Sequence, residues 1–118
     1  AFDRLRDTGV ILGFHAEFEP QALGIDLQAM VAVRLTRHSR EMVDTFHAHL
    51  LGLPEVLTFY HVAGADDFLV HVAVRDSHHL RGFLLASFTQ REEVAHIETH
   101  LIFECRRNPE VPVYVKPA

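Results

Sequence analysis

The sequence predicts an α+β fold in which one four-stranded antiparallel sheet carries two helices on one face. Two observations support this prediction. Two segments with helical spacing of apolar residues alternate with four segments typical of strands, and Gly, Pro, Asn or Asp residues separate most of them. The length of 118 residues fits one domain with a buried core. The order strand, helix, strand, strand, helix, strand is that of the ferredoxin-like βαββαβ sandwich.

The first three elements lie between residues 29 and 62. Residues 29–36 alternate between apolar and other side chains, which predicts a strand. Ser39 is a good N-cap for the following helix, and Glu41 lies in its first turn. The helix ends at Gly52 and Pro54. Its apolar residues recur at helical spacing: Met42, Val43, Phe46 and Leu50. Residues 55–62 form the second predicted strand.

The second half repeats this scheme. Residues 64–67, with the sequence Gly-Ala-Asp-Asp, form a tight turn, and residues 68–74 form the third strand. Ser77 or Asp76 caps the second helix, because both residue types accept hydrogen bonds from the first turn. Its apolar stripe is Leu80, Phe83, Leu84 and Phe88. Residues 93–104 are predicted as the last strand.

The start of the sequence lies outside this unit. Residues 1–9 are typical of the end of a helix, with Gly9 as its stop. Residues 10–24 comprise an apolar linker strand (10–18) and a loop, and residues 25–118 form the main domain. We expect the linker strand to pair with the same segment of a second subunit, since an exposed apolar edge would otherwise aggregate.

Charge and composition limit the possible partners. The net charge is −5 with His neutral, and the densest basic cluster is Arg106–Arg107, so this chain alone is a poor candidate for binding nucleic acid. No apolar run is long enough to cross a bilayer, and residues 1–9 show no signal-peptide pattern. The single cysteine, Cys105, fits a reducing compartment. We therefore expect a cytoplasmic protein without a membrane partner.

The adjacent carboxylates of Asp66 and Asp67 raise the question of a site. Asp and Gly are common in hairpin turns, and turn chemistry alone is one interpretation. The second Asp, however, places a charge directly before the buried strand at Phe68. Backbone N–H groups around Gly64 and Ala65 can bind a ligand's carboxylate, and an Asp can bind its ammonium group. An amino-acid site at this turn is therefore the second interpretation.

The ten histidines suggest a further hypothesis, that of a metal site. His96, Glu98 and His100 alternate along the last predicted strand, so they project from one face, and two His with a carboxylate are the ligand types of zinc or iron. His71 and Arg34 are expected on the same face. No second cluster converges on them, so we prefer the interpretation that they line a subunit interface, and we predict no metal.

Catalytic motifs do not emerge from the sequence. Ser39, Ser77 and Ser87 fall at caps or on a helix, outside any Gly-flanked serine elbow. A phosphate-binding glycine loop is also missing. We therefore predict a protein that is not an enzyme, with no catalytic residues and no cofactor.

An ordered set of short motifs resembles the Lrp/AsnC (feast/famine) family of transcriptional regulators over residues 2 to about 104. The motif residues are Leu5, Gly9, Val10, Ile11, Gly13, Phe14, Ala16, Pro20, Leu23 and Gly24, then Pro54-Glu55-Val56, Val62-Ala63-Gly64-Ala65-Asp66-Asp67-Phe68-Leu69, and Glu98-Thr99. Two positions depart from the family pattern. Asp66 stands where the family often has an aromatic residue, and Ala65 where it often has a polar one.

This resemblance implies the effector-binding and oligomerisation domain of a bacterial or archaeal regulator. It implies a dimer built by packing of sheet faces, possibly an octamer, and an amino acid or similar small molecule bound near the second hairpin turn, between dimers. The effector-binding residues it implies are Gly64, Ala65, Asp66, Asp67, Glu98 and Thr99. The family's DNA-reading helix-turn-helix would precede residue 1, so DNA would be bound only through that domain.

Two alternatives share the scaffold. One is a small dimeric α+β barrel enzyme of the monooxygenase type, which would begin at its first core strand and lack residues 2–14. The other is a stand-alone amino-acid-binding module without a DNA-binding domain. The residues encoded before Ala1 would distinguish the second alternative from a regulator.

Overall fold

A computed structural model describes residues 19–115 of the chain. The helix end predicted for residues 1–9 and the linker strand predicted for 10–18 lie outside the described residues. In chain order the elements are η1 (Pro20–Leu23), β1 (Leu27–Leu35), α2 (Arg40–Leu51), β2 (Val56–His61), β3 (Phe68–Val74), α3 (Ser77–Leu84), η2 (Leu85–Thr89) and β4 (Val94–Leu101).

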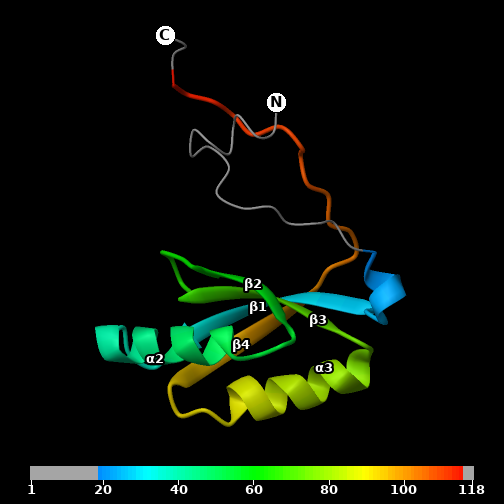
Figure 1. Cartoon of the computed structure of the whole chain (residues 1–118). Helices are drawn as coiled ribbons and strands as arrows, with labels where there is room; N and C mark the ends of the chain where they lie inside the picture. The colour runs from blue at the N-terminus through cyan, green and yellow to red at the C-terminus, as the bar shows by residue number, and fades with distance from the viewer. Residues whose placement is uncertain (1–18, 116–118) are drawn as a thin grey trace.

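The four strands form one antiparallel sheet in the order β2-β3-β1-β4. Figure 1 shows α2 and α3 together on one face of this sheet. Both βαβ halves therefore place their helix on the same side, and the predicted ferredoxin-like βαββαβ sandwich is confirmed. Val33 lies at the centre of the sheet, where it pairs with Phe68 of β3 and Ile97 of β4.

The core lies between the sheet and the two helices. Alternate residues of β1 and β3 face the helices and are buried, as the alternation in the sequence predicted. Three phenylalanines, Phe46 of α2, Phe68 of β3 and Phe88 of η2, are fully buried. The ring of Phe46 lies 5.2 Å from that of Phe68 and 6.0 Å from that of Phe88, centroid to centroid. These contacts join both helices to the middle of the sheet.

Both helices begin at capped residues. The hydroxyl of Ser39 accepts a hydrogen bond of 3.2 Å from the N–H of Met42, which confirms Ser39 as the first N-cap. The carboxylate of Asp76 accepts one of 2.8 Å from the N–H of His79. Asp76 is therefore the second cap, and Ser77 is the first residue of α3. The helix continues into η2, a π-helical turn that ends at Thr89.

Some element boundaries differ from the predicted ones, and β1 spans Leu27–Leu35 instead of the predicted 29–36. The last strand was predicted to reach residue 104, but β4 ends at Leu101, and the N–H of Ile102 makes one further bond of 2.9 Å to Gln28. The loop predicted for residues 19–24 contains a single 3-10 turn, which Gly24 ends with a φ of 78°. The tight turn predicted at 64–67 lies within a longer loop, residues 62–67, between the end of β2 and the start of β3. The N–H of Val62 donates to the carbonyl of Asp67 at 2.9 Å and closes this loop.

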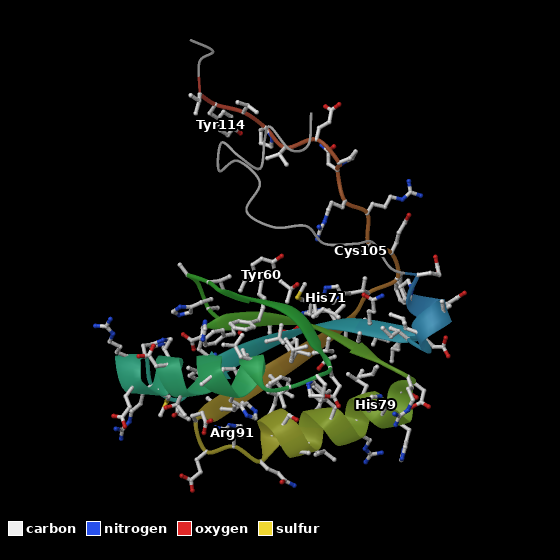
Figure 2. The ribbon with its side chains drawn as sticks, in the orientation of Figure 1. Tyr60, His71, His79, Arg91, Cys105 and Tyr114 are labelled. Carbon is white, nitrogen blue, oxygen red and sulfur yellow. The ribbon has the colours of Figure 1, made fainter. Side chains whose placement is uncertain are left out.

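The face of the sheet opposite the helices is not covered by residues 19–115. We call it the open face. Figure 2 shows His71 and Tyr60 on this side, away from α2 and α3. By strand register it carries Gln28, Met30, Ala32, Arg34, Thr58, Tyr60, Leu69, His71, Ala73, His96, Glu98 and His100. The predicted common face of Arg34, His71, His96, Glu98 and His100 is thus confirmed.

Candidate functional site

The loop between β2 and β3 positions four of the six predicted site residues. Gly64 has a φ of 134°, a conformation that side chains disfavour, while open space surrounds the position where a Cβ would stand. Backbone conformation, and not crowding, therefore calls for glycine here. Gly64 and Ala65 are exposed, and their backbone N–H groups have no hydrogen-bond acceptor among residues 19–115. A ligand can approach these two amides directly.

Asp67 is the best-connected residue of the loop. Its side chain is buried, and its Oδ2 accepts a hydrogen bond of 2.7 Å from the N–H of Leu35 at the end of β1. Its own N–H donates to the carbonyl of Val33 at 2.9 Å. The carboxylate therefore fastens the start of β3 to the end of β1, instead of bonding its own turn amides.

His38 is a site residue that the sequence did not indicate. Its Nδ1 lies 2.7 Å from Oδ1 of Asp67, and its side chain is 73% exposed. The two residues are far apart in the sequence, so no spacing pattern connects them. An exposed partner can move away, which leaves one carboxylate oxygen of Asp67 accessible to a ligand's cation. Asp66, which is half-buried, makes no hydrogen bond to residues 19–115.

The structure does not bring Glu98 and Thr99 to this loop within one copy. Glu98 lies on the open face of β4 opposite Ala32, and Thr99 lies opposite Val31 with its side chain on the helix side. The loop is at one end of the β2–β3 hairpin, and β1 separates β3 from β4. The six residues therefore form two separate groups in a single chain.

The open face concentrates titratable groups. Nε2 of His71 donates a hydrogen bond of 2.7 Å to Oε1 of Gln28, and burial lowers the pKa of His71. Because an amide oxygen only accepts, Nε2 of His71 carries the proton. His100 lies 3.7 Å from Glu98 on the exposed edge strand. Among residues 19–115 no group of three or more His, Cys, Asp or Glu side chains is arranged to hold a metal ion.

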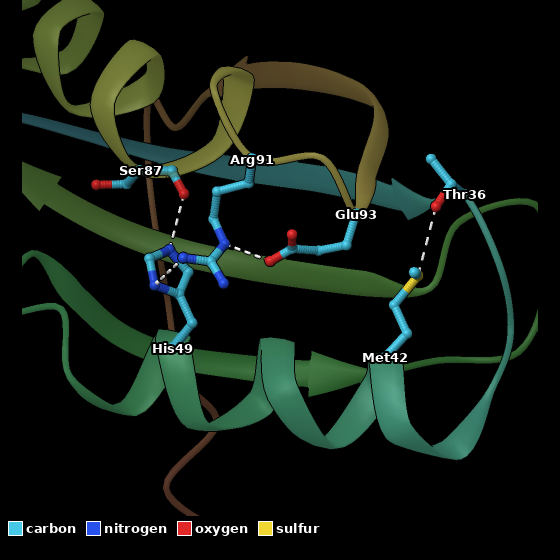
Figure 3. A network of polar contacts seen from close by, with 6 residues as sticks. All are labelled: Thr36, Met42, His49, Ser87, Arg91 and Glu93. Carbon is cyan, nitrogen blue, oxygen red and sulfur yellow. Dashed lines mark hydrogen bonds and ion pairs between the residues drawn. The ribbon is translucent and has the colours of Figure 1, made fainter.

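A second polar network joins α2 to the end of the α3–η2 segment (Figure 3). Nε2 of His49 donates to the carbonyl of Ser87 at 2.8 Å, and its Nδ1 accepts from Arg91 at 3.2 Å. Arg91 also pairs with Glu93. Burial alone would raise the pKa of Glu93, but a backbone hydrogen bond to its carboxylate and the nearby Arg91 guanidinium outweigh this effect. The pKa of Glu93 is therefore lowered. This network has a structural role, since it holds the helices and β4 in place.

Two hollows of the described surface lie away from the loop. One, of about 280 Å³, is lined by residues near Asp26, Gln28 and Phe103. The other, of about 330 Å³, lies between Gly24, Leu57 and the paired side chains of Glu55 and His79. Neither contains a residue of the β2–β3 loop. A ligand at the loop would therefore need a second surface to enclose it.

The class of the chain follows from its match to a family model. Residues 28–108 match the model described as the Lrp/AsnC ligand binding domain, so this is an α+β ligand-binding domain. The chain belongs to the Lrp/AsnC family. The resemblance that the sequence motifs indicated is confirmed.

Relatives and solved structures agree with this membership. The HTH-type transcriptional regulator AldR of Mycolicibacterium smegmatis is 43% identical over 101 residues, which cover 86% of this chain and 59% of that protein. A feast or famine regulatory protein of M. tuberculosis, complexed with L-methionine, has a TM-score of 0.76 and 27% identity and covers 94% of this chain and 73% of its own. A transcriptional regulator of Neisseria meningitidis in an L-Met complex shares the fold, with a TM-score of 0.83 and 21% identity. The match covers 96% of this chain and 73% of that protein's chain.

These relatives bear on the enzyme alternative that the sequence left open. They are transcriptional regulators, so the prediction that the chain is not an enzyme is confirmed and the barrel monooxygenase alternative is not favoured. The chain spans 59% of the length of the M. smegmatis relative. Among residues 19–115, none of the helices has the length and apolarity that crossing a membrane requires.

Proposed function

We propose that this chain is the effector-sensing and oligomerisation domain of a bacterial or archaeal transcription regulator that acts in the cytoplasm. Its effector is an amino acid or a similar small molecule, as in the two methionine complexes of similar fold. DNA would be bound by a separate helix-turn-helix, because the net charge of −5 suits this domain poorly to that task.

The observation that carries the proposal is the Asp67–His38 pair beside the free amides of Gly64 and Ala65. An α-amino acid presents a carboxylate and an ammonium group a short distance apart. The carboxylate would bind the two amides, and the ammonium would replace His38 at Oδ1 of Asp67. Asp66 adds a second negative charge to the loop.

Subunit contact completes the site in this proposal. Glu98 and Thr99 lie on β4, which β1 separates from β3 and the loop, so the residues that serve the same ligand would come from the β4 of a neighbouring copy. A homodimer, and a larger ring of dimers, would supply that neighbour. Effector binding and assembly would then stabilise each other.

Thermal melting with each of the twenty standard amino acids tests the proposal. We expect at least one to raise the melting temperature, because a ligand at about 100 times its Kd stabilises the folded state by about 2.7 kcal/mol. Asp67→Asn should remove the shift. Asp44→Asn, an exposed acid on α2, is the matched control and should keep it.

His38→Ala separates a ligand site from ordinary turn chemistry. Because His38 is exposed and competes for the carboxylate, its removal should leave folding unchanged and increase the apparent affinity for the effector. If no amino acid shifts the melt of either the wild type or His38→Ala, this class of effector is excluded.

A further inference from the structure

The C-terminal tail, residues 103–115, leaves the body of the domain. The bond between Ile102 and Gln28 is the last backbone hydrogen bond that joins this end of the chain to the described part of the sheet. Figure 1 shows that the tail departs on the side of the sheet opposite α2 and α3, which is the side of the open face. It has neither helix nor strand in the structure.

The tail carries large apolar side chains in water. Phe103 is 96% exposed and Tyr114 is 91% exposed. Residues 111–115, Val-Pro-Val-Tyr-Val, place three β-branched residues at every second position. This composition and this period of two are typical of a strand with one apolar side. The segment is therefore a strand former that pairs with no strand of the described sheet.

Pro112 indicates how such a strand would pair. Successive residues of a strand direct their backbone N–H groups to opposite edges. Val111, Val113 and Val115 share one edge, while Pro112 and Tyr114 share the other. Proline has no N–H, so it is tolerated where that edge faces solvent. The tail can thus add to a sheet through its valine edge, and Pro112 blocks further strand addition at the other.

The sheet has one edge suited to receive it. β4 carries His96, Glu98 and His100, and charged or polar groups of this kind protect an edge. The other edge strand, β2, reads Val-Leu-Thr-Phe-Tyr-His and has no Asp, Glu, Lys or Arg. Its Leu57 and Tyr60 are exposed. Because the N–H of Val62 points to β3, the N–H groups of Phe59 and His61 point outward.

We propose that residues 111–115 of one copy add as a strand to the outer edge of β2 in a second copy. The preceding residues 102–110 can span roughly 30 Å when extended, which suffices to cross to a neighbouring molecule. The main-chain ladder supplies affinity, and Tyr60, which is exposed on the open face, gives the valines a large apolar neighbour. The exchange requires a second copy of this chain but no effector.

Two proline variants of the full chain test the predicted edge. Val113→Pro removes an N–H of the pairing edge, whereas Tyr114→Pro, the matched control, removes one that faces solvent. Since the loss of a hydrogen bond costs about 1 kcal/mol, we expect Val113→Pro to weaken association about fivefold in sedimentation, and Tyr114→Pro to change it much less. Equal effects of the two variants would overturn the proposal.

A mixing experiment distinguishes exchange between copies from pairing within one chain. His61→Pro removes an outward N–H of β2 and should weaken association as Val113→Pro does. A mixed pair has two contacts between a tail and a β2 edge. In one of them the intact tail of the His61→Pro chain meets the intact β2 of the Val113→Pro chain, so association should partly recover. No recovery would show pairing within one chain and would overturn exchange. The amino-acid melts judge the effector site separately, because these variants leave Asp67 and Gly64 intact.

Discussion

Two neighbouring carboxylates of the β2–β3 loop differ in what they contact. Asp67 is buried and accepts the N–H of Leu35, while Asp66 is only half-buried and makes no hydrogen bond to the described residues. The same residue type thus has two roles at adjacent positions. Asp67 links two strands of the sheet, and Asp66 contributes charge to the surface around the loop.

Asp67→Ala should destabilise the fold, and Asp66→Ala should not. Removal of the Asp67 carboxylate leaves the N–H of Leu35 without its acceptor in a buried position, at a cost of about 1–3 kcal/mol in the free energy of unfolding. A surface change such as Asp66→Ala is expected to stay within about 0.5 kcal/mol. Urea denaturation of both variants without any ligand measures the difference. Equal stabilities would mean that the Asp67–Leu35 bond contributes nothing.

His71 should make the stability of the domain depend on pH. Burial lowers its pKa below the 6.5 of the unfolded chain, so below pH 6.5 the unfolded chain takes up a proton that the folded chain resists. Stability should therefore fall as the pH falls through 6.5 and level off below the folded-state pKa.

The variant His71→Gln tests this prediction, since glutamine can still donate to Gln28 but does not titrate. Its unfolding free energy, measured by urea on both sides of pH 6.5, should fall less steeply than that of the wild type. His78→Gln, an exposed change at the start of α3, is the control for the other histidines. Identical slopes for His71→Gln and the wild type would contradict the prediction.

At the scale of the elements, each helix is stabilised by an N-cap side chain that accepts a hydrogen bond from its first turn. Asp76→Ala should cost about 1 kcal/mol of stability, because the N–H of His79 loses its acceptor. Ser77→Ala should cost little, since Ser77 lies inside the helix and alanine favours helices. Thermal melting compares the two variants. A larger loss for Ser77→Ala would reassign the cap.

The sequence predicted the elements because their signals are local. The alternation in β1, the cap at Ser39 and the stop at Gly52 all lie within or next to the element they define. It did not predict contacts that depend on tertiary packing. The Asp67–His38 pair and the His49–Arg91 network join residues far apart in the chain, and no periodicity connects them.

Boundaries failed for a related reason. Residues 102–104 are as apolar and strand-like as the β4 residues before them, but β1 begins at Leu27, so little of the neighbouring strand remains beyond Leu101 to pair with them. The site prediction placed Gly64, Ala65 and Asp67 in one loop by sequence. It could not show that Glu98 and Thr99 lie on a strand that β1 separates from β3.

For the whole molecule, the open face should be buried between two copies. It mixes apolar residues with histidines, and a half-apolar sheet face of this size is normally covered by a partner. Leu69→Glu would place a charge in that contact and should shift the chain towards monomer in sedimentation at micromolar concentration. Leu85→Glu, on the exposed side of η2, is the control and should leave assembly intact. A wild-type chain that is monomeric under these conditions would refute the prediction.

His38 and Ser39 are adjacent in the chain, and one contacts the loop carboxylate while the other caps α2. A molecule that takes the place of His38 on Asp67 therefore acts one peptide bond away from the hydroxyl that holds the first turn of the helix. If the proposed effector takes this place, occupancy of the loop and fraying of the first turn of α2 would be coupled equilibria, and such coupling would be reciprocal. Whatever loosens the start of α2 would then change the affinity at the loop by the same factor as the bound molecule changes the order of the helix. A signal would thus pass from a surface hairpin to the helical layer without any rearrangement of the sheet.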